Sequence, residues 1–177
     1  FHVDGFMDTM DALHSYQPRE RKLEILKDSH IGAFAVIMLA ACGLIYLGAF
    51  SQITDRKTVG IVCAGFFLAR CLSGIGVVCF PSAKKEGMLH GFADRAQKKK
   101  VKWALGFQGL LCAGTMAAMD ICMAGAVVLT ALAVFWRYYR KCMKELRGIT
   151  GDTAGWFVVI CEVSMTVAAA AISLINS

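Results

Sequence analysis

The stretch IGAFAVIMLAACGLIYLGAF, residues Ile31–Phe50, decides the fold class because it contains no charged side chain. A helix needs about 20 mostly apolar residues to cross the hydrocarbon core of a bilayer. The whole chain of 177 residues is 57% hydrophobic and 18% charged, with a mean hydropathy of +0.57. That composition is too apolar for a soluble domain of this length, so the sequence predicts an all-α integral membrane protein.

Further apolar segments predict five transmembrane helices in one polytopic membrane domain that covers residues 1–177. The other four segments are Thr58–Phe80, Trp103–Met119, Ile121–Trp136 and Ala154–Ile175. The two middle segments are short and are separated by Asp120, so a re-entrant pair is the alternative there. Arg70 and Glu162 are the only charges inside the predicted spans. An unpaired charge at that depth is costly, so each needs a partner, and we expect the two to pair with one another or to contact substrate.

Positive charge is distributed unevenly between the two sides of the predicted membrane domain. Sixteen of the nineteen lysines and arginines fall in segments 1–29, 81–102 and 137–153, which five crossings place on one side. Positive residues near helix ends are retained in the cytoplasm, so these segments are predicted to face it. The basic run 96–103 then serves topology and attraction to the anionic lipid bilayer, and no nucleic acid is needed to explain it.

An acidic row near the start of the chain is the first candidate site. In DGFMDTMD, Asp4, Asp8 and Asp11 fall within about 60° of one another on a helix. Like charges at this spacing repel, unless a cation lies between them. Mg²⁺ fits because it takes carboxylate oxygens and bridges them to substrate phosphates. The alternative is three solvated aspartates on an interfacial helix.

Two more motifs lie just before predicted spans on the same cytoplasmic side. KDSHIGAF begins at Lys27 and RGITGDTAG begins at Arg147. Glycine-rich turns at helix N-termini offer backbone N–H groups to phosphate, whereas the alternative is that the polar residues only cap the helices. The polar residues concerned are Asp28, Ser29, Asp152 and Thr153.

These motifs together make the chain recognisable. FHVDGFMDTMDALHS, RERKLEILKDSHIGAF and RGITGDTAGWFVVICE resemble, in order and spacing, the signatures of the cobalamin synthase family, the adenosylcobinamide-GDP ribazoletransferases. The resemblance covers essentially the whole chain but only the C-terminal portion of a family member, because members carry a further N-terminal region. Ala12, Ala35 and Arg147 stand where the family motifs have glycine, and every motif carboxylate is kept.

The resemblance implies an activity and roles for the motif residues. The family transfers the adenosylcobinamide-phosphate group of adenosylcobinamide-GDP to α-ribazole, or to its 5′-phosphate, and releases GMP with Mg²⁺ as cofactor. It implies a bacterial or archaeal cytoplasmic (inner) membrane protein, while the oligomeric state stays open. The implied metal ligands are Asp4, Asp8 and Asp11, and the implied catalytic residues are Asp28 and Asp152. The implied substrate-binding residues are Lys27, Ser29, Arg70, Arg147, Thr153 and Glu162.

Three other classes of membrane protein remain as alternatives. CDP-alcohol phosphotransferases and UbiA-type prenyltransferases also hold Mg²⁺-diphosphate with aspartate rows at helix ends. The first class would place Ala-Arg where this chain has Asp8 and Thr9, and the second would need two separate aspartate-rich motifs. A transporter would use the aspartates as an ion site, but such sites usually lie near the membrane midplane rather than at its rim.

Overall fold

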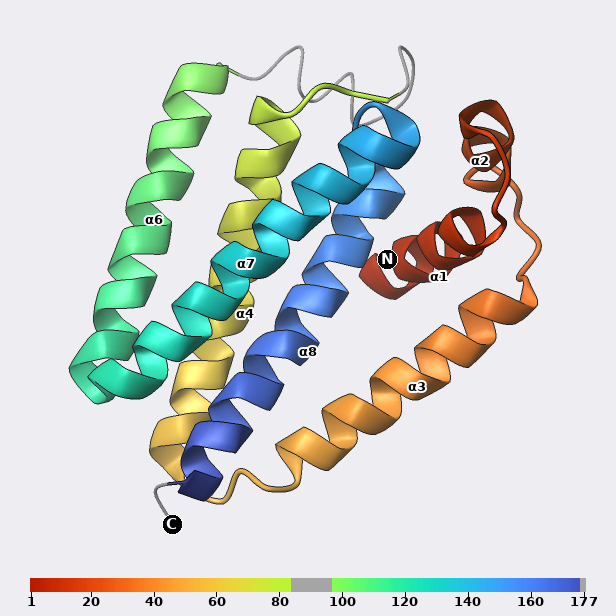
Figure 1. The fold of residues 1–177 in the computed structure, drawn as a ribbon. Coiled ribbons are helices and arrows are strands. Elements are labelled where there is room, and N and C mark those ends of the chain that lie inside the picture. Colours follow the sequence, from red (N-terminus) through yellow and green to blue (C-terminus); the bar gives the residue numbers. More distant parts are fainter. Residues whose placement is uncertain (84–96, 176–177) are drawn as a thin grey trace.

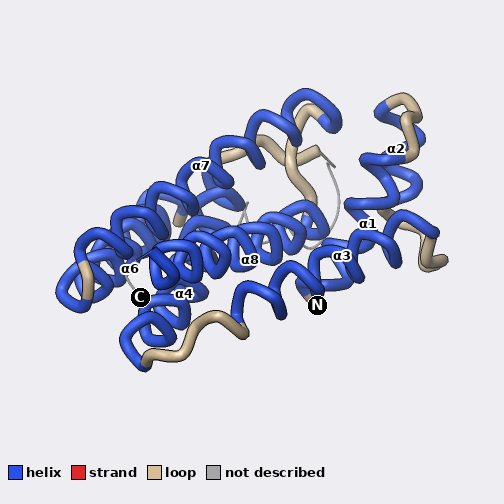
Figure 2. The backbone as a smooth tube through the Cα atoms, turned by 60° about the horizontal axis from the view of Figure 1, so that its bottom comes forward, coloured by secondary structure: helices blue, strands red, loops and turns tan. Residues whose placement is uncertain are grey.

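The computed structural model describes residues 1–83 and 97–175, and all of its regular elements in those ranges are helices (Figures 1 and 2). The helices are α1 (His2–His14), α2 (Arg19–Ile25), α3 (Ala33–Phe50), α4 (Arg56–Cys79), α6 (Lys98–Met119), α7 (Ile121–Leu146) and α8 (Gly151–Ile175). The predicted all-α fold is confirmed. The segment 84–96, which contains part of the predicted basic loop, lies outside the described residues.

Four of the described helices are long and apolar enough to cross a membrane, namely α3, α4, α7 and α8. They support the predicted multi-pass membrane protein. The third predicted span, Trp103–Met119, corresponds to α6, which is less apolar because it begins with the lysines at 98–102. With 22 and 26 residues, α6 and α7 are about 33 and 39 Å long, so they do not form a short re-entrant pair. Figure 1 shows α6 running between the same two ends of the bundle as α4.

The fourth predicted span was too short at its cytoplasmic end. The prediction ended it at Trp136 and placed 137–153 in a loop, whereas α7 continues to Leu146. The extension is stabilised by Tyr138, Cys142 and Leu146, which are all buried and recur every four residues on one face. The lysines and arginines of this segment lie on the other faces of the helix. They lower its mean hydropathy, and the amphipathic pattern was therefore not recognised from sequence.

Helix α8 is the central element of the bundle and packs against α1, α3, α4 and α7. Phe157, Cys161, Met165 and Ala169 are all fully buried and form one stripe along α8. At the N-terminal end of this stripe, the Phe157 ring stacks on Tyr138 of α7 with ring centroids 5.0 Å apart. The helix that carries the RGITGDTAG motif is therefore held rigidly by the core.

Polar contacts tie α2 to the C-terminal end of α7. The buried Lys22 ammonium pairs with Glu145 at 2.5 Å. Arg19 donates from Nε to the Leu146 carbonyl at 2.8 Å and from Nη2 to the Ala83 carbonyl at 3.2 Å. A cation at a helix C-terminus complements the helix dipole, and Arg19 also joins the segment after α4 to the end of α7.

A short stretch of paired backbone fixes the turn between α7 and α8. The Ile149 N–H donates to the Pro81 carbonyl at 2.9 Å, and the Ala83 N–H donates to the Ile149 carbonyl at 2.8 Å. A Cβ on Gly148 would lie 2.5 Å from the Ala83 nitrogen, so only glycine allows this approach. The turn that leads into α8 is thus held by the segment that follows α4.

The predicted orientation can be tested by labelling exposed positions at opposite ends of the bundle. In a background without the eight native cysteines, we expect Gln17→Cys to react with a membrane-impermeant maleimide only from the cytoplasmic side. We expect Ser51→Cys, at the exposed turn between α3 and α4, to react only from the opposite side. Labelling of both positions from one side would contradict the charge-based topology.

Candidate active site

The acidic row lies on α1, and α1 is in near-backbone contact with the start of α8. A Cβ on Gly5 would lie 2.8 Å from the Asp152 carbonyl oxygen, and a Cβ on Gly155 would lie 3.0 Å from the His2 carbonyl oxygen. Distances this short leave no room for a side chain, so the two glycines permit the close approach of the helices. Neither glycine was predicted from sequence to have a role, although both lie inside the motifs.

This contact places carboxylates of two helices at one end of the bundle. Asp4 directly precedes Gly5, and Asp8 lies about 40° from Asp4 around α1. Asp152 stands in the first turn of α8, where Gly5 touches its backbone. Asp4 is exposed, whereas Asp8 and Asp152 are half-buried. The structure therefore brings the acidic row and the RGITGDTAG motif together, as the sequence predicted from their shared side of the membrane.

Asp11, the third member of the row, binds the N-terminus of α3. Its Oδ2 accepts the Gly32 N–H at 2.7 Å and its Oδ1 accepts the Ala35 N–H at 2.9 Å. A Cβ on Gly32 would lie 2.6 Å from this carboxylate, so a side chain at position 32 would displace Asp11. The N–H groups and the positive end of the α3 dipole compensate the Asp11 charge, which explains part of the row without a cation.

Removing the Asp11 cap should cost stability more than it costs chemistry. We expect Asp11→Ala to lower the free energy of unfolding by about 1–2 kcal/mol, because two N–H groups of α3 lose their acceptor. Asp4→Ala is the matched control, since Asp4 is exposed and makes no such cap. Thermal unfolding in detergent measures both. An unchanged melting temperature for Asp11→Ala, with weakened Mg²⁺ binding, would instead favour the metal role predicted from sequence.

The start of α8 is built by a reciprocal pair of threonines. The Thr150 N–H donates to Thr153 Oγ1 at 2.9 Å, and the Thr153 N–H donates to Thr150 Oγ1 at 3.2 Å. Thr153, predicted to bind substrate, is fully buried in this structure and helps to cap the helix. Thr150 was missed, although the Thr-x-x-Thr spacing is that of a capping box. The Thr150 hydroxyl also donates to Asp152 Oδ2 at 3.4 Å, so the cap orients that carboxylate.

Arg147 ends α7 in a left-handed conformation with φ 55° and ψ 29°. Glycine adopts this conformation without strain, which is the physical reason for the glycine in the family motif at this position. The Arg147 side chain is exposed at the same end of the bundle as Asp152, where it can reach an anion.

Two substitutions of Arg147 distinguish the effect of its backbone conformation on stability from the effect of its charge on substrate binding. We expect Arg147→Gly to raise the free energy of unfolding by about 1 kcal/mol, because the left-handed conformation no longer crowds a Cβ. Arg147→Ala should leave stability unchanged. If the guanidinium contacts substrate phosphate, KM rises in both variants, whereas a purely structural residue leaves KM unchanged in both.

The KDSH segment forms an exposed turn between α2 and α3. Asp28 Oδ1 accepts the His30 N–H at 3.0 Å and lies 2.6 Å from His30 Nδ1. The hydrogen bond from the His30 side chain, followed by that from its backbone, lowers the pKa of Asp28. A carboxylate with a lowered pKa stays ionised but is a weaker proton acceptor. Lys27 and Ser29 are exposed beside it.

Arg70 and Glu162 lie apart from these motifs and pair with each other, as predicted. Arg70 Nη1 donates to Glu162 Oε1 and also to the Phe66 carbonyl, the latter at 2.6 Å. At about 1.5 Å per residue, Arg70 is about 14 Å from the C-terminal end of α4. The pair is therefore within the membrane-spanning part of the bundle rather than among the aspartates.

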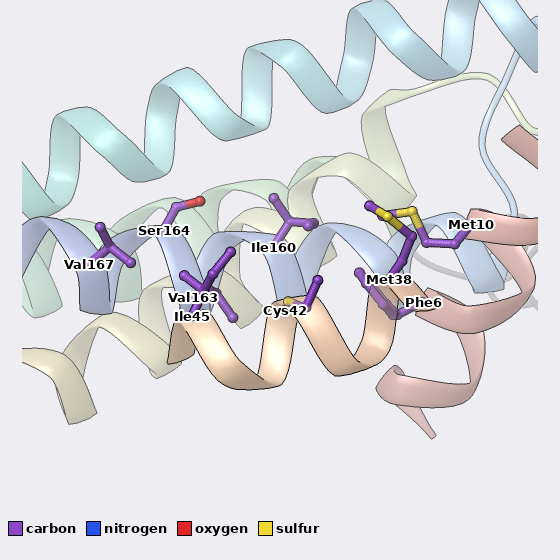
Figure 3. A pocket seen from close by; sticks show the side chains of 10 residues that line it. Phe6, Met10, Met38, Cys42, Ile45, Ile160, Val163, Ser164 and Val167 are labelled. Atoms are coloured by element: carbon purple, nitrogen blue, oxygen red, sulfur yellow. The ribbon is translucent and has the colours of Figure 1, made fainter. Parts of the chain in front are cut away.

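An apolar cavity of about 360 Å³ lies between α1, α3 and α8 (Figure 3). Phe6 and Met10 of α1 line it together with Met38 and Cys42 of α3 and Ile160 of α8. Phe6 and Met10 project from the side of α1 opposite the acidic row. The amphipathic helix α1 thus separates an apolar cavity from the polar end of the bundle.

The donor set at the polar end fits Mg²⁺ only with help from a substrate. Within residues 1–83 and 97–175, no group of three or more His, Cys, Asp or Glu side chains is arranged to hold a metal ion. Mg²⁺ commonly takes one or two protein carboxylates and completes its six ligands with water and substrate phosphate. Asp4 and Asp8 supply hard oxygen donors of this kind. Thr9 Oγ1 and Trp156 Nε1, on the same two helices, are buried without a hydrogen-bond partner in the described part of the chain.

The fold and this site define a multi-pass helical membrane protein with carboxylates gathered at one end of the bundle. The sequence model of the CobS family, cobalamin-5-phosphate synthase, matches residues 1–170, and the chain belongs to this family.

Several curated relatives share one name. An adenosylcobinamide-GDP ribazoletransferase of Lachnoclostridium phytofermentans is 40% identical over 161 residues, which are 91% of this chain and 61% of the relative. Those of Herpetosiphon aurantiacus and Roseiflexus are 33% and 32% identical, over 99% and 98% of this chain and 68% and 62% of the relatives. The chain thus spans somewhat less than two thirds of the length of most of these relatives. No solved structure matches the chain.

Proposed function

We propose that this chain forms part of an enzyme that transfers the adenosylcobinamide-phosphate group of adenosylcobinamide-GDP to α-ribazole or α-ribazole 5′-phosphate, releasing GMP. The observation that carries the proposal is the contact of Gly5 with Asp152, which sets the acidic row of α1 beside the start of α8. Family membership and the names of the relatives support the same reaction. The whole activity is proposed for the protein in a membrane, with the site on its cytoplasmic side.

Asp4 and Asp8 are the residues that would hold Mg²⁺, together with water and the phosphates of the substrate. When bound, Mg²⁺ would neutralise charge on the diphosphate and stabilise GMP as it departs. We place Asp11 outside this set because its oxygens accept two backbone N–H groups of α3. Asp11 then acts through position, by fixing the C-terminal half of α1 to α3.

The remaining motif residues orient the phosphates and receive a proton. The N-terminus of α8, which begins at the exposed Gly151, presents the positive end of its dipole to a diphosphate. Lys27, Ser29 and Arg147 are exposed and supply a hydroxyl and two cations for phosphate oxygens. Asp152 accepts the proton of the attacking ribose hydroxyl, a role for which Asp28 is less suited because hydrogen bonds from His30 lower its pKa.

Reconstitution tests the reaction directly. The protein in proteoliposomes is given adenosylcobinamide-GDP, α-ribazole or its 5′-phosphate, and Mg²⁺, and the products are identified by mass spectrometry. We expect equal amounts of GMP and of the cobalamin product, and neither product when EDTA replaces Mg²⁺. Turnover of a CDP-alcohol or prenyl diphosphate instead would assign the site to one of the alternative classes of membrane enzyme.

A further inference from the structure

One outer face of α4 carries a charge inside a membrane-spanning helix. The Arg70 side chain is 48% exposed, although it lies about 14 Å from the C-terminal end of α4. Ionisable residues at such depth almost always face protein or a water-filled cavity, because a charge in the bilayer costs at least about 2.5 kcal/mol. Pairing with Glu162, which is 20% exposed, covers one side of the guanidinium only. Lipid is therefore a poor neighbour for the outward side.

The outward side of Arg70 calls for hydrogen-bond acceptors. A guanidinium has five N–H donors on three nitrogens. In the described part of the chain, both hydrogen bonds that Arg70 donates come from Nη1 and go to Phe66 and Glu162. The donors on Nε and Nη2 remain for a neighbour that presents oxygen atoms.

The surroundings of Arg70 have the shape of a helix contact rather than of a water-filled cavity. Cys63, Phe67 and Arg70 are all exposed, and their spacing of four and three residues places them in one stripe along α4. Such a stripe is a ridge against which another helix packs. Phe67 is 49% exposed, and water against this ring and Cys63 would be unfavourable.

Helix α3 leaves room for a further element beside this stripe. Only Ala35 of α3 is buried in the structure, and α3 packs against α1 and α8. Figure 1 shows α3 and α4 diverging from the turn that joins them, with α8 packed against both. One side of α3 and the outer stripe of α4 thus flank α8 without covering one another.

We propose that the stripe Cys63, Phe67 and Arg70, together with Glu162, is the docking face for an additional membrane-spanning helix from outside these 177 residues. The helix would place an oxygen-bearing side chain, an amide, hydroxyl or carboxylate, level with Arg70. The relatives have the length to supply it, since the match covers only 61% of the Lachnoclostridium phytofermentans relative. The proposal does not depend on the reaction assigned above.

Site-specific photocrosslinking tests the docking face. The chain is expressed in membranes together with the part of the Lachnoclostridium phytofermentans relative that lies outside the match, and p-benzoylphenylalanine replaces Phe67. We expect a crosslinked peptide from that added part by mass spectrometry. The matched control is the same probe at Phe107, a 69% exposed residue of α6, which should give lipid adducts. Lipid adducts alone at position 67, or a crosslink to a second copy of this chain, would overturn the proposal.

The role of the charge is tested separately. We expect Arg70→Met to lower the crosslinked fraction at position 67 at least fivefold, because the oxygen-bearing partner loses its donors. Arg70→Lys keeps a positive charge at this depth and should retain most of the crosslink, which guards against a variant that fails to fold. Lys57→Met, at the exposed start of α4, should leave the fraction unchanged. Equal crosslinking in Arg70→Met and the unchanged chain would contradict the recognition of Arg70.

Discussion

Asp8→Asn is expected to lower turnover by about 1,000-fold while the protein still inserts and purifies normally. The substitution keeps the size of the side chain but removes a charge from the half-buried position beside the start of α8. A neutral amide oxygen is a much weaker ligand for Mg²⁺ than a carboxylate, and it does not offset the charge of a diphosphate. Single-turnover assays in proteoliposomes across a Mg²⁺ titration measure the effect.

Two comparisons make the Asp8 result specific. Asp11→Asn should lose much less turnover, since an amide oxygen still accepts a hydrogen bond from the N-terminus of α3. Glu20→Gln, an exposed position on α2, should have no effect. Near-normal activity of Asp8→Asn at saturating Mg²⁺ would return the acidic row to a set of solvated side chains on an interfacial helix.

Gly5→Ala is expected to lower activity by about 100-fold, although glycine has no group that takes part in chemistry. The new Cβ would lie 2.8 Å from the Asp152 oxygen and 2.9 Å from its Cα, so α1 has to move away from α8. A displacement of about 1 Å in a site that acts by positioning costs about this factor. The overpacked contact should also lower the free energy of unfolding by about 1–3 kcal/mol.

The control for Gly5 is a glycine in open space. A Cβ on Gly43 of α3 meets no atom within 4 Å, so Gly43→Ala should leave both activity and melting temperature close to those of the unchanged protein. Stability and turnover are measured on the same preparations. If Gly5→Ala keeps full activity, the close contact of α1 and α8 does not position the carboxylates.

Features that follow from the composition of a segment, such as a membrane span, were predictable from sequence. Features that depend on contacts between helices were not. The uncharged stretch 31–50 identified a membrane span because apolar length alone selects for the bilayer core. The pairing of Arg70 with Glu162 followed from depth, since each charge needs a partner inside the membrane. The length of α7 was missed because Arg137 and Lys141 lower the mean hydropathy of this segment, whereas the buried stripe on another face decides how far the helix continues.

The residues of the candidate site could be predicted from sequence, but the groups that they contact could not. Helical spacing correctly placed Asp4, Asp8 and Asp11 on one face of α1. No local pattern shows that this face reaches two different helices, so the interaction of Asp11 with the backbone of α3 was not foreseen. That contact depends on Gly32, which lies 21 residues further along the chain. Because glycine has no side chain, nothing in the sequence indicates that it binds Asp11.

The two attachments of α1 make this short helix a mechanical link. Its N-terminal part is in close contact with α8 at Gly5, and its C-terminal part is hydrogen-bonded to α3 through the carboxylate of Asp11. Helix α8 is anchored in the core, whereas α3 has a single buried residue. If α3 tilts so that the apolar cavity beside Phe6 widens, one of two things follows. Either the hydrogen bonds between Asp11 and α3 break, or α1 rotates about its contact with α8 at Gly5. In the second case, the same motion that opens the cavity turns Asp8 relative to Asp152.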